Sequence, residues 1–262
     1  MEITHAGISE NILIPLWARA KETMYGNSIL QDEKAIEIMK HIKYDFSKFD
    51  KLWITQIDLA VMTRILDDKA EKFISEYPDC IVINVGCGLD TRFERIDNGS
   101  VTWYDLDKPE TIALRREFFK ENERYNMISK SVLDESWINY IKEKDRKVLI
   151  IGEGIFIDFS ETELESILKM LHKNFSQCEC LFEIPPFLKK ELESYGALKK
   201  SENCDQNNIQ MKNTDFYGKY AEVIEEYTFS DFYNNNGNKK ILNKIPYIKN
   251  NCKDKIVHIK VN

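Results

Sequence analysis

The sequence feature that most constrains the fold is a short apolar run that ends in two closely spaced glycines. Residues 80–85 read Cys-Ile-Val-Ile-Asn-Val, and Gly86 and Gly88 follow directly. A short apolar, β-branched run that stops at a turn signal is typical of a strand buried on both faces of a parallel sheet. Glycines at its end let the backbone approach a ligand closely and turn sharply into a helix.

Further segments of the same kind follow at regular spacing. Strands are expected at 101–104, 125–129, 147–151 and 181–184, with helices from about 109 to 122 and behind the capping box that begins at Ser160. Residues 223–229 and 256–261 complete a set of seven strands. Strands that alternate with helices in this rhythm predict an α/β fold with a doubly wound, mostly parallel seven-stranded sheet.

The two ends of the chain depart from this alternation. Residues 32–42, behind a capping Asp32, and residues 56–73 carry apolar side chains at helical spacing, so an N-terminal helical extension is expected. Residues 187–220 are interpreted as helical and then irregular, and 234–238 as a loop. We therefore expect one domain in three parts, with a helical cap at 1–77, an alternating core at 78–186 and a tail at 187–262.

Composition excludes several classes of function. The net charge of −7 argues against nucleic acid or anionic lipid as a general partner. No apolar run approaches the roughly 20 residues that span a bilayer, and the N-terminus does not resemble a signal peptide. Six scattered cysteines predict reduced thiols in a cytoplasm, and the Cys178-x-Cys180 pair has no second pair at metal-site spacing. We expect a cytoplasmic protein without a metal, and no pattern indicates its oligomeric state.

The residues after the glycines distinguish between possible ligands. The dinucleotide fingerprint requires a third glycine three positions after Gly88, where this chain has Thr91. Asp90 adds a negative charge where a pyrophosphate would lie. A carboxylate beside a phosphate is unfavourable, but beside a cationic sulfonium or amino group it is acceptable. A dehydrogenase that uses a nucleotide cofactor is therefore disfavoured.

Acidic residues after two other strands extend this reading. Asp105 and Asp107 lie about 20 residues beyond the loop, where a carboxylate can accept hydrogen bonds from both ribose hydroxyls of an adenosyl group. Glu153, between Gly152 and Gly154, follows the fourth strand and is expected to face the same crevice. The combination predicts an adenosine ligand without a phosphate. The alternatives are a tight turn with helix-capping aspartates and, for Glu153, a solvated loop carboxylate.

Several segments in this order resemble the leucine carboxyl methyltransferase family, which includes tetracenomycin-type polyketide O-methyltransferases. They are Leu16–Glu22, Ala60–Arg64, Val82–Arg92, Trp103–Pro109 and Leu149–Glu153. The resemblance implies a class I methyltransferase fold, S-adenosylmethionine as cofactor and S-adenosylhomocysteine as product. It also implies that the core at 78–186 binds the cofactor and that the tail covers the substrate.

The resemblance assigns roles to individual residues. Arg64, with Arg19 or less favourably Lys21, is similar to the basic pair that holds the methionine carboxylate, a group that an arginine fork grips with two hydrogen bonds. Gly86 is similar to the glycine that lies against the cofactor. The implied cofactor site also contains the loop residues Cys87, Gly88, Asp90 and Thr91, the ribose-binding Asp107 with its neighbour Asp105, the Ser131–Val132 pair beside adenine, and Glu153.

The predicted activity is O-methylation of a carboxylate or a phenolic hydroxyl on a small-molecule acceptor, such as a polyketide or other secondary metabolite. A protein C-terminal carboxyl methyltransferase and a non-catalytic cofactor-binding protein are the alternatives. No catalytic residue is assigned, because His172 lies late in a helix and is expected to be packed or solvent-facing. Seven aromatic residues between 216 and 233 are interpreted as core or lid packing, or alternatively as the lining of an acceptor pocket.

Overall fold

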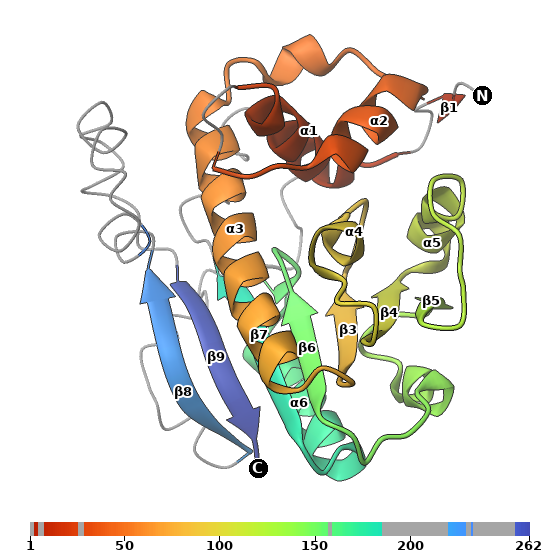
Figure 1. Cartoon of the computed structure of the whole chain (residues 1–262), viewed down its shortest axis with the longest axis vertical. Coiled ribbons are helices and arrows are strands. Elements are labelled where there is room, and N and C mark those ends of the chain that lie inside the picture. The colour runs from red at the N-terminus through yellow and green to blue at the C-terminus, as the bar shows by residue number, and fades with distance from the viewer. Residues whose placement is uncertain are drawn as a thin grey trace.

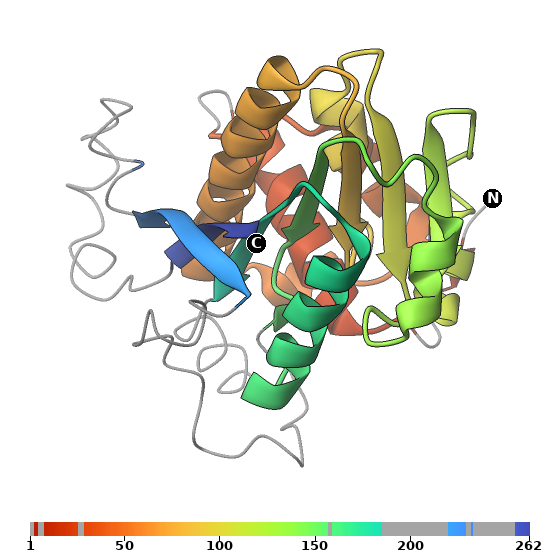
Figure 2. The ribbon, with the colours of Figure 1, turned by 90° about the horizontal axis from the view of Figure 1, so that it is seen from below.

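A central sheet with helices on both faces forms the body of the molecule (Figures 1 and 2). The computed structural model describes residues 3–4, 8–25, 29–156, 159–184, 220–228, 232 and 255–262. The seven strands of the central sheet are β3 (Ile81–Val85), β4 (Thr102–Asp107), β5 (Tyr125–Ser129), β6 (Val148–Gly152), β7 (Cys178–Ile184), β8 (Ala221–Thr228) and β9 (Lys255–Val261). Their order is β5-β4-β3-β6-β7-β9-β8, and β9 runs antiparallel to both of its neighbours. The predicted fold class is confirmed.

The helices divide between the two faces of this sheet. The described helices are α1 (Glu10–Thr23), α2 (Glu33–His41), α3 (Trp53–Glu76), α4 (Arg92–Ile96), α5 (Pro109–Arg115) and α6 (Glu161–Asn174), with 3-10 turns η1 (Phe46–Phe49) and η2 (Glu135–Tyr140). One apolar core joins the sheet to α1–α5, and a second joins its other face to α6 and η2. Alternate residues of each central strand enter opposite cores, which explains why the runs are continuously apolar.

The N-terminal helical extension lies beyond one edge of the sheet. Helices α1 and α2 pack against each other over the carboxyl ends of the parallel strands, and α3 descends from them along one face (Figure 1). A short parallel pair, β1 (Ile3–Thr4) and β2 (Ile42–Lys43), accompanies them. Because β3 is in register with β4 and β6, Gly86, Asp107 and Glu153 emerge at this same edge. The extension therefore covers the edge at which open α/β sheets bind ligands.

The structure corrects some boundaries of the predicted elements. Helix α5 ends at Arg115 rather than near Asn122. The Asn122 side chain instead accepts the N–H groups of Arg124 and Tyr125 and turns the chain into β5. Strand β7 begins at Cys178, three residues before the predicted start. The expected helical segment at 187–220, apart from its last residue, and the loop at 234–238 lie outside the described residues. Among the described helices, none is long and apolar enough to span a membrane.

We expect the central strands to dominate stability. Leu149, in β6, is fully buried, so Leu149→Ala should lower the free energy of unfolding by about 2–5 kcal/mol through lost contacts and a cavity. Leu133, 43% exposed, is the matched control, and Leu133→Ala should change stability by about 0.5 kcal/mol or less. Urea denaturation of both variants measures the difference. Equal losses would contradict this assignment of the core.

Candidate functional site

The glycine loop needs glycine for two separate reasons. Gly86 and Gly88 have φ of +64° and +47°, in the left-handed region that side chains with a Cβ rarely adopt. A Cβ on Gly86 would also lie 2.5 Å from Cδ1 of Ile155, which comes from the segment after β6. The loop thus passes directly beneath this apolar side chain, and a larger residue at position 86 would displace one or the other.

Asp107 lies beside the loop at the carboxyl end of β4. Its Oδ2 accepts the N–H of Gly88 at 2.9 Å and its Oδ1 accepts the N–H of Lys108 at 2.7 Å. Burial raises the pKa of the Asp107 carboxyl above its ordinary value, although these two hydrogen bonds oppose the shift. The Thr111 side chain is a further hydrogen-bond partner, and the Asp107 side chain is partly exposed, so its carboxylate can still accept from a ligand. Asp107 is therefore an acceptor held in a fixed orientation at the loop.

Asp105 has a different environment, although it lies only two residues away. It is fully buried and accepts hydrogen bonds from Nδ2 of Asn84 at 3.3 Å and Nε1 of Trp103 at 3.0 Å. Its other oxygen accepts from Nε of Arg115 at 2.8 Å and from the Tyr125 hydroxyl. Arg115 also donates to the Gly88 carbonyl at 3.0 Å. Asp105 therefore supports the loop from below, through Arg115.

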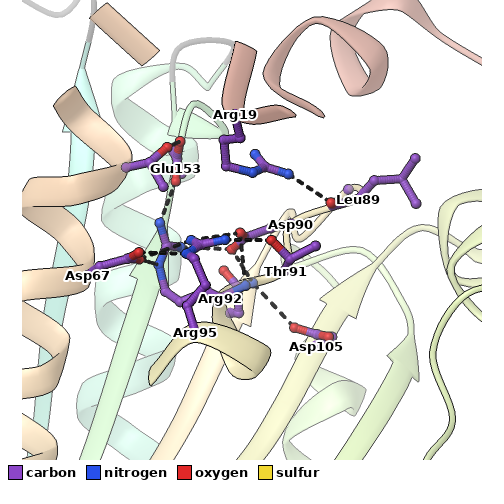
Figure 3. A network of polar contacts seen from close by, with 12 residues as sticks. Arg19, Asp67, Leu89, Asp90, Thr91, Arg92, Arg95, Asp105 and Glu153 are labelled. Atoms are coloured by element: carbon purple, nitrogen blue, oxygen red, sulfur yellow. Dashed lines mark hydrogen bonds and ion pairs between the residues drawn. The ribbon is translucent and has the colours of Figure 1, made fainter. Parts of the chain in front are cut away.

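A buried ion network lies next to the loop (Figure 3). Asp90 accepts from Nη1 of Arg92 at 2.9 Å, from Nη2 of Arg95 at 3.3 Å and from Nδ2 of Asn84 at 3.1 Å. Asp67, on α3, pairs with the same two arginines at 2.7 and 2.6 Å. Burial alone would raise the pKa of Asp90, but the charges of Arg92 and Arg95 outweigh it and hold that pKa well below its usual range.

The same residues occupy the start of helix α4. Oδ1 of Asp90 accepts the N–H of Arg92 at 3.1 Å, so the chain's own carboxylate takes a donor that could otherwise bind an anion. Thr91 is fully buried, and its hydroxyl donates to Asp32. A pyrophosphate placed at this helix end would meet the negative charge of Asp90. This geometry supports the prediction that the ligand is not a dinucleotide.

Two further predicted residues border the space above the network. Glu153 accepts from Nη2 of Arg92 at 2.5 Å and from the Thr63 hydroxyl at 2.7 Å. Arg19, on α1, donates from Nε to Asp32 at 3.0 Å and from Nη2 to the Leu89 carbonyl at 2.8 Å. Figure 3 shows Glu153 and Arg19 on the same side of the network. Arg19 and Glu153 thus bring a basic and an acidic group to the same side of the network, beside the loop.

The other predicted residues lie in varied surroundings. Arg64 is exposed on α3 and pairs with Asp68 at 2.7 Å, and Lys21 pairs with Asp50 at the surface. Cys87 is buried, and burial raises the pKa of its thiol well above the usual value. Ser131 and Val132 form the turn after β5, with Val132 buried and its carbonyl accepting from Nε1 of Trp137 at 3.0 Å.

His172 lies at the opposite edge of the sheet. Its Nδ1 is hydrogen-bonded to the Asn262 carbonyl, and Cys178 pairs with Val261, so this histidine is next to the amino end of β7. Its ring is 6.0 Å from that of Tyr220. The carboxyl ends of the parallel strands are at the far end of the sheet. His172 therefore lies away from the edge of the sheet at which the glycine loop lies.

Sequence reasoning did not identify most of the partners of the site residues. It used Asp32 only as a helix cap, and it assigned no role to Asp67, Arg95 or Arg115. Arg92 and Arg95 are three residues apart, which places them on one side of a helix, and this spacing was an available signal. The carboxylates of Asp32 and Asp67, which pair with these arginines, come from distant segments, and no local sequence pattern predicts such ion pairs.

Comparisons with known proteins agree with this geometry. A model of the family described as leucine carboxyl methyltransferase matches residues 13–171, more than half of the chain. The chain belongs to the leucine carboxyl methyltransferase family. It is 31% identical over 178 residues to the tetracenomycin polyketide synthesis O-methyltransferase TcmP of Streptomyces glaucescens, covering 68% of this chain and 66% of that protein. It is 28% identical over 190 residues to the S-adenosyl-L-methionine-dependent methyltransferase dpfgK of Gibberella zeae, and this match covers 66% of this chain and 63% of that protein. The matches span slightly less than two thirds of these relatives.

Solved structures of other proteins show the same fold. Magnesium protoporphyrin IX methyltransferase from Synechocystis PCC 6803, with bound SAH, superposes with a TM-score of 0.50 at 12% identity, covering 88% of this chain and 94% of that one. The PH0226 protein of Pyrococcus horikoshii OT3 superposes with a TM-score of 0.51 at 12% identity, covering 75% of this chain and 88% of that one. The sheet, with its antiparallel β9, is that of class I methyltransferases, as the family predicts.

The ion network should make stability depend on acid pH. The pKa of Asp90 is lower in the folded than in the unfolded chain, where it is about 3.9, so its contribution is complete above that pH and is lost as the pH falls through the folded value. Asp90→Asn should therefore be less stable than the wild type near neutral pH, and the difference should shrink between about pH 4 and pH 2. Urea unfolding at several pH values measures it. A difference that stays constant over this range would contradict the assignment.

Proposed function

We propose that this chain is an S-adenosylmethionine-dependent O-methyltransferase that modifies a small-molecule acceptor. The observation that carries the proposal is the partly exposed Asp107 carboxylate, held by the Gly88 N–H beside a loop whose helix end is already occupied by Asp90. An adenosyl ribose can donate two hydroxyls to such a carboxylate, and a phosphate has no favourable place there. Membership of the leucine carboxyl methyltransferase family supports the same cofactor.

The charges beside the loop suit the amino-acid part of this cofactor. A methionine moiety carries a carboxylate and an ammonium group, and Arg19 and Glu153 lie on the same side of the network beside the loop. Arg19 is 2% exposed and, within the part of the chain that the structure describes, uses two of its five N–H groups on Asp32 and Leu89, which leaves three for a carboxylate. We infer that Arg19 binds the carboxylate and Glu153 faces the ammonium. We propose that Arg64 joins Arg19 on the carboxylate by exchanging its present partner, Asp68, for the ligand.

The cofactor supplies an electrophilic methyl on a sulfonium, which is an excellent leaving group. The chain must hold the donor, align an acceptor oxygen about 3 Å from the methyl and exclude water. Ile155 lies against Gly86, and a Cβ on Gly152 would lie 2.3 Å from Cε2 of Phe156, so these side chains form an apolar wall beside the loop. A carboxylate acceptor needs no base, whereas a phenol with a pKa near 10 gains from one.

The acceptor class rests on the relatives and on chemistry. TcmP is named for tetracenomycin polyketide synthesis, and we propose a comparable hydroxyl or carboxylate on a small secondary metabolite as the acceptor. We assign no catalytic base among the described residues, and the raised pKa of the Cys87 thiol keeps it protonated, so it is not in the form that accepts a proton. Incubating the enzyme with tritium-labelled cofactor and fractionated metabolite or peptide extracts would identify the acceptor. Label only in peptide C-termini would favour a protein carboxyl methyltransferase instead.

Calorimetry with S-adenosylhomocysteine measures how much each proposed cofactor-binding residue contributes to affinity. Asp107→Ala, Arg19→Ala and Arg64→Ala should each weaken binding at least tenfold, or about 1.4 kcal/mol, because each removes a charged partner of the ligand. Asp97→Ala is the control, since Asp97 pairs with Arg124 at the surface and should leave affinity unchanged.

Three results would contradict parts of this proposal. Absence of binding at millimolar S-adenosylhomocysteine, or preferential binding of NAD, would refute the cofactor assignment. Unchanged affinity in a well-folded Asp107→Ala protein would refute the ribose contact. Unchanged affinity in Arg64→Ala, together with a loss in Arg19→Ala, would leave the carboxylate to Arg19 alone.

A further inference from the structure

Asp32 joins four elements around the glycine loop. It precedes α2, and its Oδ1 accepts the N–H of Ala35 at 2.9 Å as a helix cap. Its Oδ2 accepts Nε of Arg19 on α1 at 3.0 Å and Nη1 of Arg95 on α4 at 3.0 Å, and also the hydroxyl of Thr91 in the loop. The Asp32 side chain is 1% exposed. We call this arrangement the Asp32 junction.

A second set of hydrogen bonds fixes Asp32 relative to Arg19. The Asp32 N–H donates to the Thr23 hydroxyl at 2.9 Å, and that hydroxyl donates to the Arg19 carbonyl at 2.8 Å. Asp32 is thus tied to the backbone of Arg19 through Thr23 and to its guanidinium through the carboxylate. The two contacts close a ring, so the direction of the Arg19 side chain is determined at both of its ends.

The direction in which Arg19 is held matters because its donors are only partly used. Within the described chain, Nη1 of Arg19 has no hydrogen-bond partner, and Nη2 uses one N–H on the Leu89 carbonyl of the loop. Its side chain is 3% exposed, so the guanidinium is almost entirely surrounded by protein beside the loop. A buried guanidinium with unused donors favours an anionic ligand group.

We propose that Asp32 is the positioning residue of the cofactor's carboxylate clamp. It holds Arg19 by the Nε edge, so that the remaining N–H groups point to the site of the methionine carboxylate. Asp32 also binds Thr91 and Arg95, so it holds Arg19 at a fixed distance from the loop that carries the ribose-binding side of the site. The proposal rests on the cofactor assignment above and goes beyond it, because Asp32 itself does not touch the cofactor.

The test compares two ligands that differ only in what the clamp would bind. S-adenosylhomocysteine carries the amino acid, whereas 5′-methylthioadenosine keeps the adenosine and the sulfur but lacks it. Asp32→Asn retains a side chain that caps helices well, so α2 should persist. The substitution removes the carboxylate that pairs with the Arg19 guanidinium. We expect at least tenfold weaker binding of S-adenosylhomocysteine and less than a twofold change for 5′-methylthioadenosine, both by calorimetry.

A double-mutant cycle shows whether Asp32 acts through Arg19. Arg19→Met should show the same selective loss, and adding Asp32→Asn to it should cause no further loss. Leu171→Ala, which removes a buried side chain from α6 far from the loop, controls for general destabilisation and should not change the ratio of the two affinities. If Asp32→Asn does not fold, Thr23→Val opens the same ring without removing a charge and should weaken S-adenosylhomocysteine selectively, to a smaller extent.

The outcomes separate this proposal from the proposed function. Equal weakening of both ligands by Asp32→Asn, or by Thr23→Val in its place, would assign Asp32 a purely structural role and overturn the proposal alone. Additive losses in the cycle would also overturn it. A wild-type protein that binds neither ligand would overturn the cofactor assignment, and this proposal with it.

Discussion

The pairing of Arg92 and Arg95 with Asp67 and Asp90 is the interaction on which the rest of the site depends. Burying an ion costs several kcal/mol unless an opposite charge and well-aligned hydrogen bonds replace the lost water. Here each arginine meets both carboxylates, and Arg92 also meets Glu153, so no member of the group is buried without a partner. Removing one partner of such a group typically costs about 3–5 kcal/mol, because it leaves an uncompensated charge.

This network fixes the glycine loop from one side, and the sheet fixes it from the other. Asp67 belongs to α3 and Glu153 follows β6, so the ion pairs bind α4 to two elements that are distant in sequence. Below the loop, the Asp105–Arg115 pair reaches the Gly88 carbonyl. Above it, Asp32 and Arg19 connect it to α1 and α2. A loop held on three sides keeps Asp107 and the glycine backbone in place before a ligand arrives, which lowers the entropic cost of binding.

The same arrangement explains how an acidic protein can present a site for a zwitterionic group. The ion pairs that link the loop to α1, α3 and β6 involve three arginines and four carboxylates, which are Arg19, Arg92, Arg95, Asp32, Asp67, Asp90 and Glu153. Most of them neutralise one another inside the protein. Arg19 retains unused donors and Glu153 lies at the border of the network, so opposite charges remain at two separate positions.

The sequence by itself determined the fold class, because the strands and helices follow from the spacing of apolar residues within each short segment. The order in which these segments alternate then indicates a doubly wound sheet. The sequence also located the loop, since Gly86 occupies a conformation that only glycine adopts easily, and it pointed to Asp107, which lies at the end of a strand. Only the tertiary structure decided which predicted acids can face a ligand. Asp90, Thr91 and Asp105 share the loop's neighbourhood with Asp107, yet their polar atoms are engaged by Arg92, Asp32 and Arg115. Asp32 lies 59 residues from Thr91 and Arg115 lies 10 residues from Asp105, so these contacts depend on how the elements pack. Arg92 is only 2 residues from Asp90, but its side chain also pairs with Asp67, 25 residues away. The charge of a side chain is encoded at one position, but whether it binds a ligand or another side chain is set by its neighbours in space.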